Sequence, residues 1–116
     1  VGLAKALSVG AAYQISVGGA LNTTVGAASA EEVGLTKTTI VGLRADIIVG
    51  AAKIRVEKSG KITIEGTEFV LKSNGPVTFN GTKVTVNSEE LILKASGKAE
   101  LQGASVQITG NPIDLN

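Results

Sequence analysis

The first 56 residues consist of seven octads that each begin with Val-Gly: VGLAKALS (1–8), VGAAYQIS (9–16), VGGALNTT (17–24), VGAASAEE (25–32), VGLTKTTI (33–40), VGLRADII (41–48) and VGAAKIRV (49–56). A dipeptide that recurs at a fixed short period indicates one structural unit stacked many times. An octad is too short for a pair of helices, but it suits one short β-strand and one corner. Glycine suits the corner because it tolerates backbone angles and close approaches that a Cβ atom would prevent. A flexible Gly-rich linker would not keep valine at so strict a spacing.

After Val56 the Val-Gly dipeptide stops, but apolar residues still recur in pairs two residues apart, and successive pairs begin 7 or 8 residues apart. Residues two apart on a strand point to the same face. The later pairs are Ile62/Ile64, Phe69/Leu71, Val77/Phe79, Val84/Val86, Leu91/Leu93, Ala99/Leu101, Val106/Ile108 and Ile113/Leu115. The same rule in the octads gives Leu7/Val9, Ile15/Val17, Thr23/Val25, Glu31/Val33, Thr39/Val41, Ile47/Val49 and Ile54/Val56. The intervening residues are expected to face solvent, and the residue after each Val-Gly is expected to be partly buried.

Turn-forming residues separate the later pairs: Gly60, Gly66, Asn74 to Pro76, Asn80-Gly81, Ser96-Gly97, Gly103 and Gly110 to Pro112. No amphipathic helical period is present, and a glycine in every octad would cost roughly 1 kcal/mol at each helical position. The sequence therefore predicts an all-β chain of about fourteen short strands. One architecture is expected over residues 1–116, with a change of repeat style near residue 57 and no domain boundary.

The composition excludes most site chemistry. The chain of 116 residues has no Cys and no His, so thiolate chemistry, disulfides and the commonest metal ligand are missing. A net charge of +1 implies no strong field for nucleic acid. The paired carboxylates Glu31-Glu32 and Glu89-Glu90 are adjacent, so on strands they point to opposite faces and do not form a catalytic pair. We expect no enzyme activity, no cofactor, no metal site and no nucleic-acid partner.

Tandem short strands can form hairpins, a single-chain solenoid or an intertwined prism of several chains. Hairpins require reversing turns and favour longer strands. With 43% hydrophobic but only 3% aromatic residues, the inward side chains are small and bury little area in one chain. Three chains wound about one axis bury every strand edge between neighbours. The pattern therefore favours an all-β, intertwined homotrimeric triple-stranded β-helix, or β-prism, of octad repeats.

Val-Gly octads followed by alternating strands, together with the ending ITGNPIDLN (108–116), resemble the carboxy-terminal needle of VgrG, the valine-glycine repeat protein of the type VI secretion system. The chain is also similar to the needles of contractile-phage tail spikes. The resemblance covers essentially the whole chain. Some phage spikes end in a His-rich iron site, which does not carry over because this chain has no His.

The resemblance implies a structural, membrane-puncturing spike: a rigid homotrimeric needle whose missing hub, preceding residue 1, connects it to the secretion tube. It also implies a PAAR-repeat cone and effectors as partners at the tip, and a target membrane breached mechanically. Such a spike is cytoplasmic in the producing bacterium before firing and is then secreted or delivered into the target cell. The alternative is the trimeric or solenoid stalk of a phage fibre or adhesin that docks a sugar, for which Tyr13 alone is a poor supply of aromatic surface.

Two local hypotheses concern charges. Glu31 falls at an inward position between Thr23 and Thr39, where three copies near an axis would repel unless hydrated, protonated or bound to a cation. We expect a wet segment there, with a bound ion as the less favoured variant, and expect Glu31→Leu to stabilise the trimer or leave it unharmed. The basic run from Lys53 to Lys61 is interpreted as a solvated outer surface, with contact to anionic lipid as the alternative.

The end of the chain is the candidate partner site. Gly110 to Pro112 predicts the final corner, since proline fixes its own φ and biases the preceding residue away from helix. Ile113 and Leu115 would form the last inward pair, with an open strand edge beside them. We therefore expect a docking platform for a small tip protein, made of Asn111, Pro112, Ile113, Asp114, Leu115 and Asn116.

Overall fold

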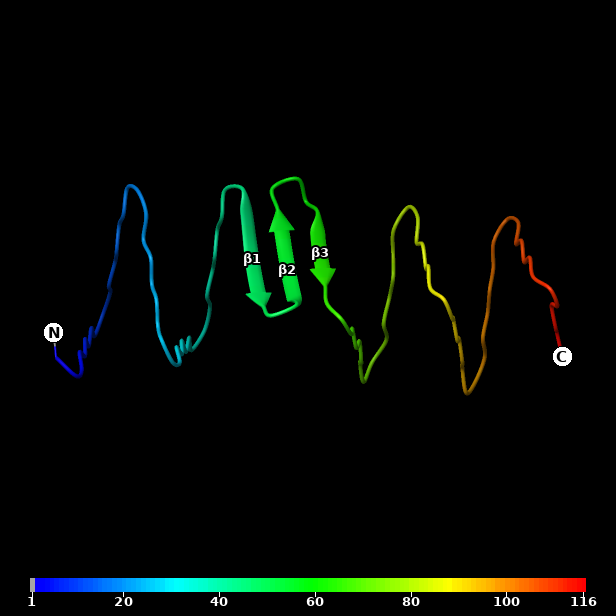
Figure 1. The fold of residues 1–116 in the computed structure, drawn as a ribbon, viewed down its shortest axis with the longest axis horizontal. Coiled ribbons are helices and arrows are strands. Elements are labelled where there is room, and N and C mark those ends of the chain that lie inside the picture. Colours follow the sequence, from blue (N-terminus) through cyan, green and yellow to red (C-terminus); the bar gives the residue numbers. More distant parts are fainter. Residues whose placement is uncertain (1) are drawn as a thin grey trace. The chain divides into compact units, whose positions relative to one another are not determined.

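The computed structural model describes residues 2–116, and over these residues the chain is all-β, without a helix, as predicted. These residues form three strands rather than the roughly fourteen expected, because only these segments pair within one chain: β1 (Arg44–Val49), β2 (Ala52–Glu57) and β3 (Ile62–Glu65), which are labelled in Figure 1. The residues group into two compact units, Val1–Glu68, which contains all three strands, and Phe69–Asn116. The boundary predicted between repeat styles, near residue 57, falls inside the first unit. That the two repeat styles form one continuous needle remains a prediction.

The backbone bends where the sequence predicted corners. In the octads it bends at the repeat glycine and the residue after it, at positions 10–11, 18–19, 26–27, 34–35 and 42–43. Further bends lie at 67, 74–75, 81–82, 89, 96–97, 104–105 and 111–112. The bend at Glu89 was not predicted, because no glycine marks it. The turn-forming dipeptide Asn87-Ser88 just before it was the available signal.

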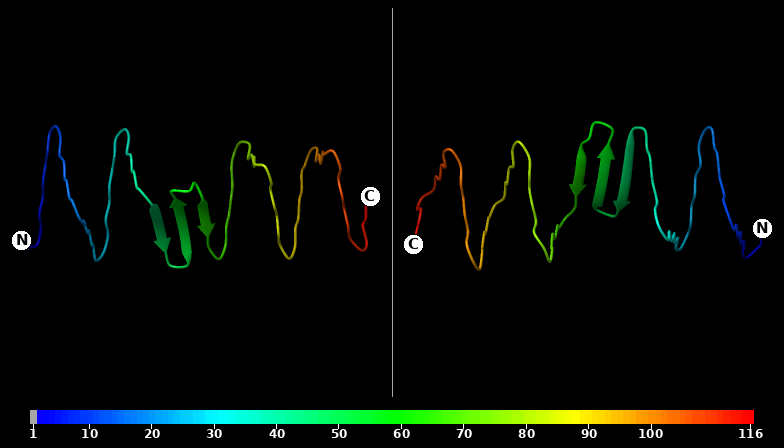
Figure 2. Two further views of the ribbon diagram at one scale, coloured as in Figure 1. Left: turned by 90° about the horizontal axis from the view of Figure 1, so that it is seen from above. Right: turned by 180° about the vertical axis from the view of Figure 1, so that it is seen from behind.

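The three strands form one antiparallel sheet in the order β1-β2-β3, and they lie side by side in each view of Figure 2. Ile47 pairs with Ile54, which in turn pairs with Ile64. Residues directly opposite each other in adjacent strands share a face, and so do residues two apart in one strand. The register therefore confirms that the predicted pairs in these strands share one side. This side, called the apolar face below, consists of Ala45, Ile47, Val49, Ala52, Ile54, Val56, Ile62 and Ile64.

Tight turns connect the three strands of the sheet. Gly50 and Ala51 join β1 to β2 as a two-residue hairpin turn, in which Gly50 has a φ of 54°. Between β2 and β3, the N–H of Gly60 donates to the carbonyl of Glu57 at 2.9 Å. The N–H of Lys58 donates to the carbonyl of Leu43 at 2.9 Å and extends the β1–β2 ladder beyond the strands.

This reversal of the chain differs from the sequence analysis, which disfavoured hairpins because the strands are short. Within one chain, the nearest free strand edge belongs to the next strand along, and a short loop has the smallest closure entropy. The left-handed backbone at Gly50 then allows the tight reversal. A meander therefore lets residues 44–65 form their backbone hydrogen bonds within one chain at the smallest loss of chain entropy.

The described residues have no buried core. The half-buried residues are Lys53, Arg55, Glu57 and Thr63, all on the side of the sheet opposite the apolar face. The expectation that the residue after each Val-Gly is partly buried is wrong for the single chain, since Leu3 and Leu35 are fully exposed. A corner places these side chains on its outer side, where this chain has nothing to cover them.

The turn geometry predicts a difference between two repeat glycines. Gly50→Ala should destabilise the fold by about 1 kcal/mol per chain, because a left-handed φ is unfavourable for a residue with a Cβ atom. Gly42→Ala should be neutral or slightly stabilising, because Gly42 has no positive φ and a Cβ there meets nothing within 4 Å. Urea unfolding followed by circular dichroism measures both. Equal losses for the two variants would rule out the hairpin turn at residues 50–51.

Candidate interaction face

The two sides of the sheet differ sharply in chemistry. One is the apolar face, and the other, called the polar face below, consists of Arg44, Asp46, Ile48, Lys53, Arg55, Glu57, Thr63 and Glu65. An antiparallel sheet with this division normally packs its apolar side on a core and leaves the other in water. Here Ile54, at the centre of the apolar face, is 42% exposed, and its neighbours Ile47 and Ile64 on the edge strands are 64% and 57% exposed. The apolar face, which would be buried in an ordinary sheet of this kind, is exposed to solvent in the single chain.

Ion pairs organise the polar face. The Arg55 Nε donates to the Asp46 Oδ1 at 2.9 Å, and the Arg44 Nε lies 3.2 Å from the Asp46 Oδ2. Lys53 and Glu65 pair across β2 and β3 at 3.5 Å. The hydrogen bond from Arg55, reinforced by the nearby positive charges, lowers the pKa of Asp46. These pairs are half-buried at the surface of the sheet, where ion pairs add little stability, but they leave the polar face close to neutral.

These pairs bear on the basic run from Lys53 to Lys61. Lys53 and Arg55, two of its cations, face carboxylates of the same sheet. Attraction of anionic lipid requires uncompensated positive charge near the surface. The arrangement favours the interpretation of this run as a solvated outer surface.

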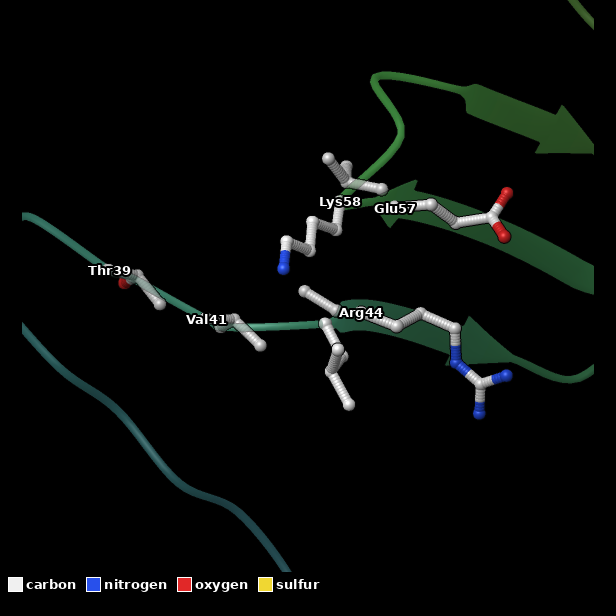
Figure 3. A pocket seen from close by; sticks show the side chains of 8 residues that line it. Thr39, Val41, Arg44, Glu57 and Lys58 are labelled. Carbon is white, nitrogen blue, oxygen red and sulfur yellow. The ribbon is translucent and has the colours of Figure 1, made fainter.

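A half-open hollow lies where the chain enters β1 and leaves β2. Its volume is about 320 Å³, and its lining residues are Thr39, Val41, Leu43, Arg44, Ala45, Val56, Glu57 and Lys58. Figure 3 shows the Lys58 side chain reaching toward the segment around Val41, whereas the charged ends of Arg44 and Glu57 point away. A substrate site would have polar groups that converge on one point. This hollow instead borders the apolar face at Ala45 and Val56.

The predicted tip lies in the second unit. The chain bends at Asn111-Pro112, as expected. A Cβ atom on Gly110 would lie 3.4 Å from the Ile113 Cγ1, which is an ordinary van der Waals distance, so the side chain of Ile113 lies close to Gly110. Ile113 is 46% exposed and Leu115 is 86% exposed, which leaves an apolar pair open at the end of the described chain. That residues 111–116 form a docking platform for a tip protein remains a prediction.

Glu31 has a partner that the sequence analysis missed. The Lys37 Nζ lies 2.6 Å from the Glu31 Oε2, across the bend at Gly34-Leu35. The spacing of six residues about a repeat glycine was the available signal, since a corner brings the flanking strands together. Both side chains are more than half exposed in the single chain, so the pair itself adds little stability there, and the effect of Glu31→Leu on the trimer remains a prediction.

Among residues 2–116, no three His, Cys, Asp or Glu side chains gather closely enough to hold a metal ion. The same residues include no helix long and apolar enough to cross a membrane. In comparisons with known proteins, no family model matches the chain, and no curated protein or solved structure matches it either.

The ion pairs of Asp46 predict a pH dependence. Because the pKa of Asp46 is lowered in the folded chain, its stabilising contribution is present above the ordinary pKa of about 3.9 and is lost as the pH falls through the folded value. The unfolding free energy of the wild type should therefore fall more steeply between about pH 5 and pH 2 than that of Asp46→Asn. The comparison cancels the titration of the other acids. Parallel curves would show that Asp46 gains nothing from Arg55 and Arg44.

Proposed function

We propose that this chain is the rigid, homotrimeric needle of a contractile injection machine, a structural spike of the type VI secretion class. The observation that carries the proposal is the bare apolar face behind a charge-compensated polar face. Such a sheet is stable in water only when something covers its apolar side. The Val-Gly octads, through their resemblance to the VgrG needle, indicate that the cover is two further copies of the same chain.

The exposed surface supports an obligate assembly. The single chain has an accessible surface of 12611 Å² for a mass of 11.7 kDa. A compact folded monomer of that mass would expose about 5,900 Å², less than half as much. An ordinary docking interface covers about 800 Å² per partner, which is far too little to remove the difference. Chains that are intertwined along their whole length can cover it.

The proposed mechanism is mechanical. In a three-chain prism each octad contributes one strand, and strands stack about 4.8 Å apart, so about fourteen strands give a rod of roughly 70 Å. Outside β1, β2 and β3, which pair within one chain, the strands of the proposed prism are bonded to other chains, so none of them can fray alone. Force from a hub that precedes residue 1 passes along the rod to a tip at residues 111–116, which carries a PAAR-type cone or effector. The spike works first in the cytoplasm of the producing cell and then outside it or in the target cell.

Oligomeric mass tests the proposal most directly. The chain should be a trimer at micromolar concentration, with no folded monomer, and it should unfold slowly because three chains must separate together. Light scattering and native mass spectrometry measure the mass. A folded monomer would refute the needle.

The inward pairs predict a contrast between neighbouring residues. Leu93→Asp should abolish assembly, because it buries three charges near the axis. Ile92→Asp is the matched control, since Ile92 lies between the members of the pair Leu91/Leu93 and should face solvent. Sedimentation of the two variants distinguishes them, and the assignment of inward positions fails if both assemble equally well.

The tip predicts a separable function. Deleting residues 111–116 should leave the trimer intact but abolish co-purification with a cognate PAAR-type cone. Leu115→Asp in the full chain is the finer version and should weaken the complex without changing the oligomeric mass. If the truncated trimer binds the cone with unchanged affinity, the platform lies elsewhere.

A further inference from the structure

The position of β1 within the octads identifies which residues of the repeat belong to the apolar face. Ala45 and Ile47 occupy the fifth and seventh positions of their octad, and both lie on this face. One octad earlier, Lys37 occupies the position of Ala45, and two octads earlier Glu31 occupies that of Ile47. An acid and a base thus stand at repeat positions that β1 uses for apolar packing.

Glu31 is the single carboxylate in this set. The fifth and seventh positions of the first six octads are Lys5, Leu7, Tyr13, Ile15, Leu21, Thr23, Ser29, Glu31, Lys37, Thr39, Ala45 and Ile47. Glu31 and Lys37 meet at 2.6 Å across their shared bend, a distance typical of a charge-assisted hydrogen bond. The chain therefore carries one compensated ion pair at a defined level of the repeat.

A strict repeat creates an alignment problem. Within residues 1–56, if one copy shifts by one octad against another, Val-Gly again meets Val-Gly, so the repeating valines keep equivalent neighbours. Strands whose patterns repeat are prone to such slips unless particular residues oppose them. The residues that differ between octads are the ones available to do so.

The Glu31–Lys37 pair is suited to this role. In aligned copies the pairs of all chains gather at one level, where opposite charges alternate and share the same water. After a slip of one octad, each Glu31 lies level with Thr23 or Thr39 of a neighbour, and each Lys37 level with Ser29 or Ala45. Charges are then desolvated at several levels without the neighbouring pairs, which is unfavourable. Single polar residues fix register in coiled coils by the same physics.

We propose that the Glu31–Lys37 pair sets the register in which copies of this chain align with one another. The inference rests on the proposed trimer and adds to it a determinant of specificity. The pair selects one alignment among the several that the octads allow.

A spin label measures the register. The chain has no cysteine, so Ser16→Cys, at a position predicted to face solvent, provides a single attachment site in the full chain. Pulsed electron paramagnetic resonance should give one narrow distance between labels in the wild-type background. The double variant Glu31→Leu/Lys37→Leu should add further distances, from copies displaced by about 4.8 Å per octad. An unchanged single distance would overturn the proposal.

A matched control is present in the second unit. Lys98 and Glu100 form an exposed pair at 2.9 Å, and both flank Ala99 at positions predicted to face solvent. Lys98→Leu/Glu100→Leu removes the same charges from the opposite face and should leave the single distance intact. Extra distances in this variant as well would show that any lost ion pair disturbs alignment, which contradicts the proposal.

A second arm covers the case in which the leucine variant does not assemble. Glu31→Thr, Lys37→Ser, Thr39→Glu and Ala45→Lys together move the pair one octad along the chain. When this chain and the wild type both carry the spin label and are mixed, the distances between their labels should show an offset of one octad along the axis, about 4.8 Å. Distances that show no offset overturn the proposal. A monomeric wild type refutes the proposed needle itself, whereas a trimer whose register ignores the pair refutes only this inference.

Discussion

The main constraint on this structure is that its short strands carry alternate apolar side chains that they cannot cover within one chain. Ile47, Ile54 and Ile64 stand in one row across β1, β2 and β3, and each is well exposed. Backbone hydrogen bonds hold this sheet together within one chain, but they do not remove its apolar side from water. The hydrophobic effect is the main driving force for association of such surfaces, and it is proportional to the area covered. The proposed assembly of several copies follows from that uncovered area.

Much of the local structure could be predicted from the sequence because its causes are local. The Val-Gly glycines mark the bends, and the alternation of apolar residues marks the face. The change of inward phase, from odd-numbered residues in Ile47/Val49 to even-numbered residues in Ile54/Val56, is confirmed by the pairing of Val49 with Ala52 across the turn. A two-residue turn between two strands shifts the inward positions from odd to even numbers, so the apolar pattern already indicated this turn.

The parts that the sequence analysis missed depend on contacts between segments. The bend at Glu89 has no glycine, and the pairing of Glu31 with Lys37 appears only when a corner brings two strands together. The reversal at Gly50 depends on which strand edge is available, and a periodic pattern does not specify that. For the candidate site, alternation identified the face, but the ion pairs of Asp46 on the opposite side required the register of β1 against β2.

The bare apolar face also has a consequence for synthesis. In the proposed assembly, a newly made chain exposes this face, and the free edges of β1 and β3, until other copies cover them. Exposed apolar surface and unpaired edges are what molecular chaperones recognise and what drives aggregation. The time that a chain spends alone then depends on how quickly it encounters others. Low expression therefore prolongs the period in which the lone chain can aggregate. Ribosomes that follow one another along a single messenger RNA deliver identical chains close together in space and time, which shortens it.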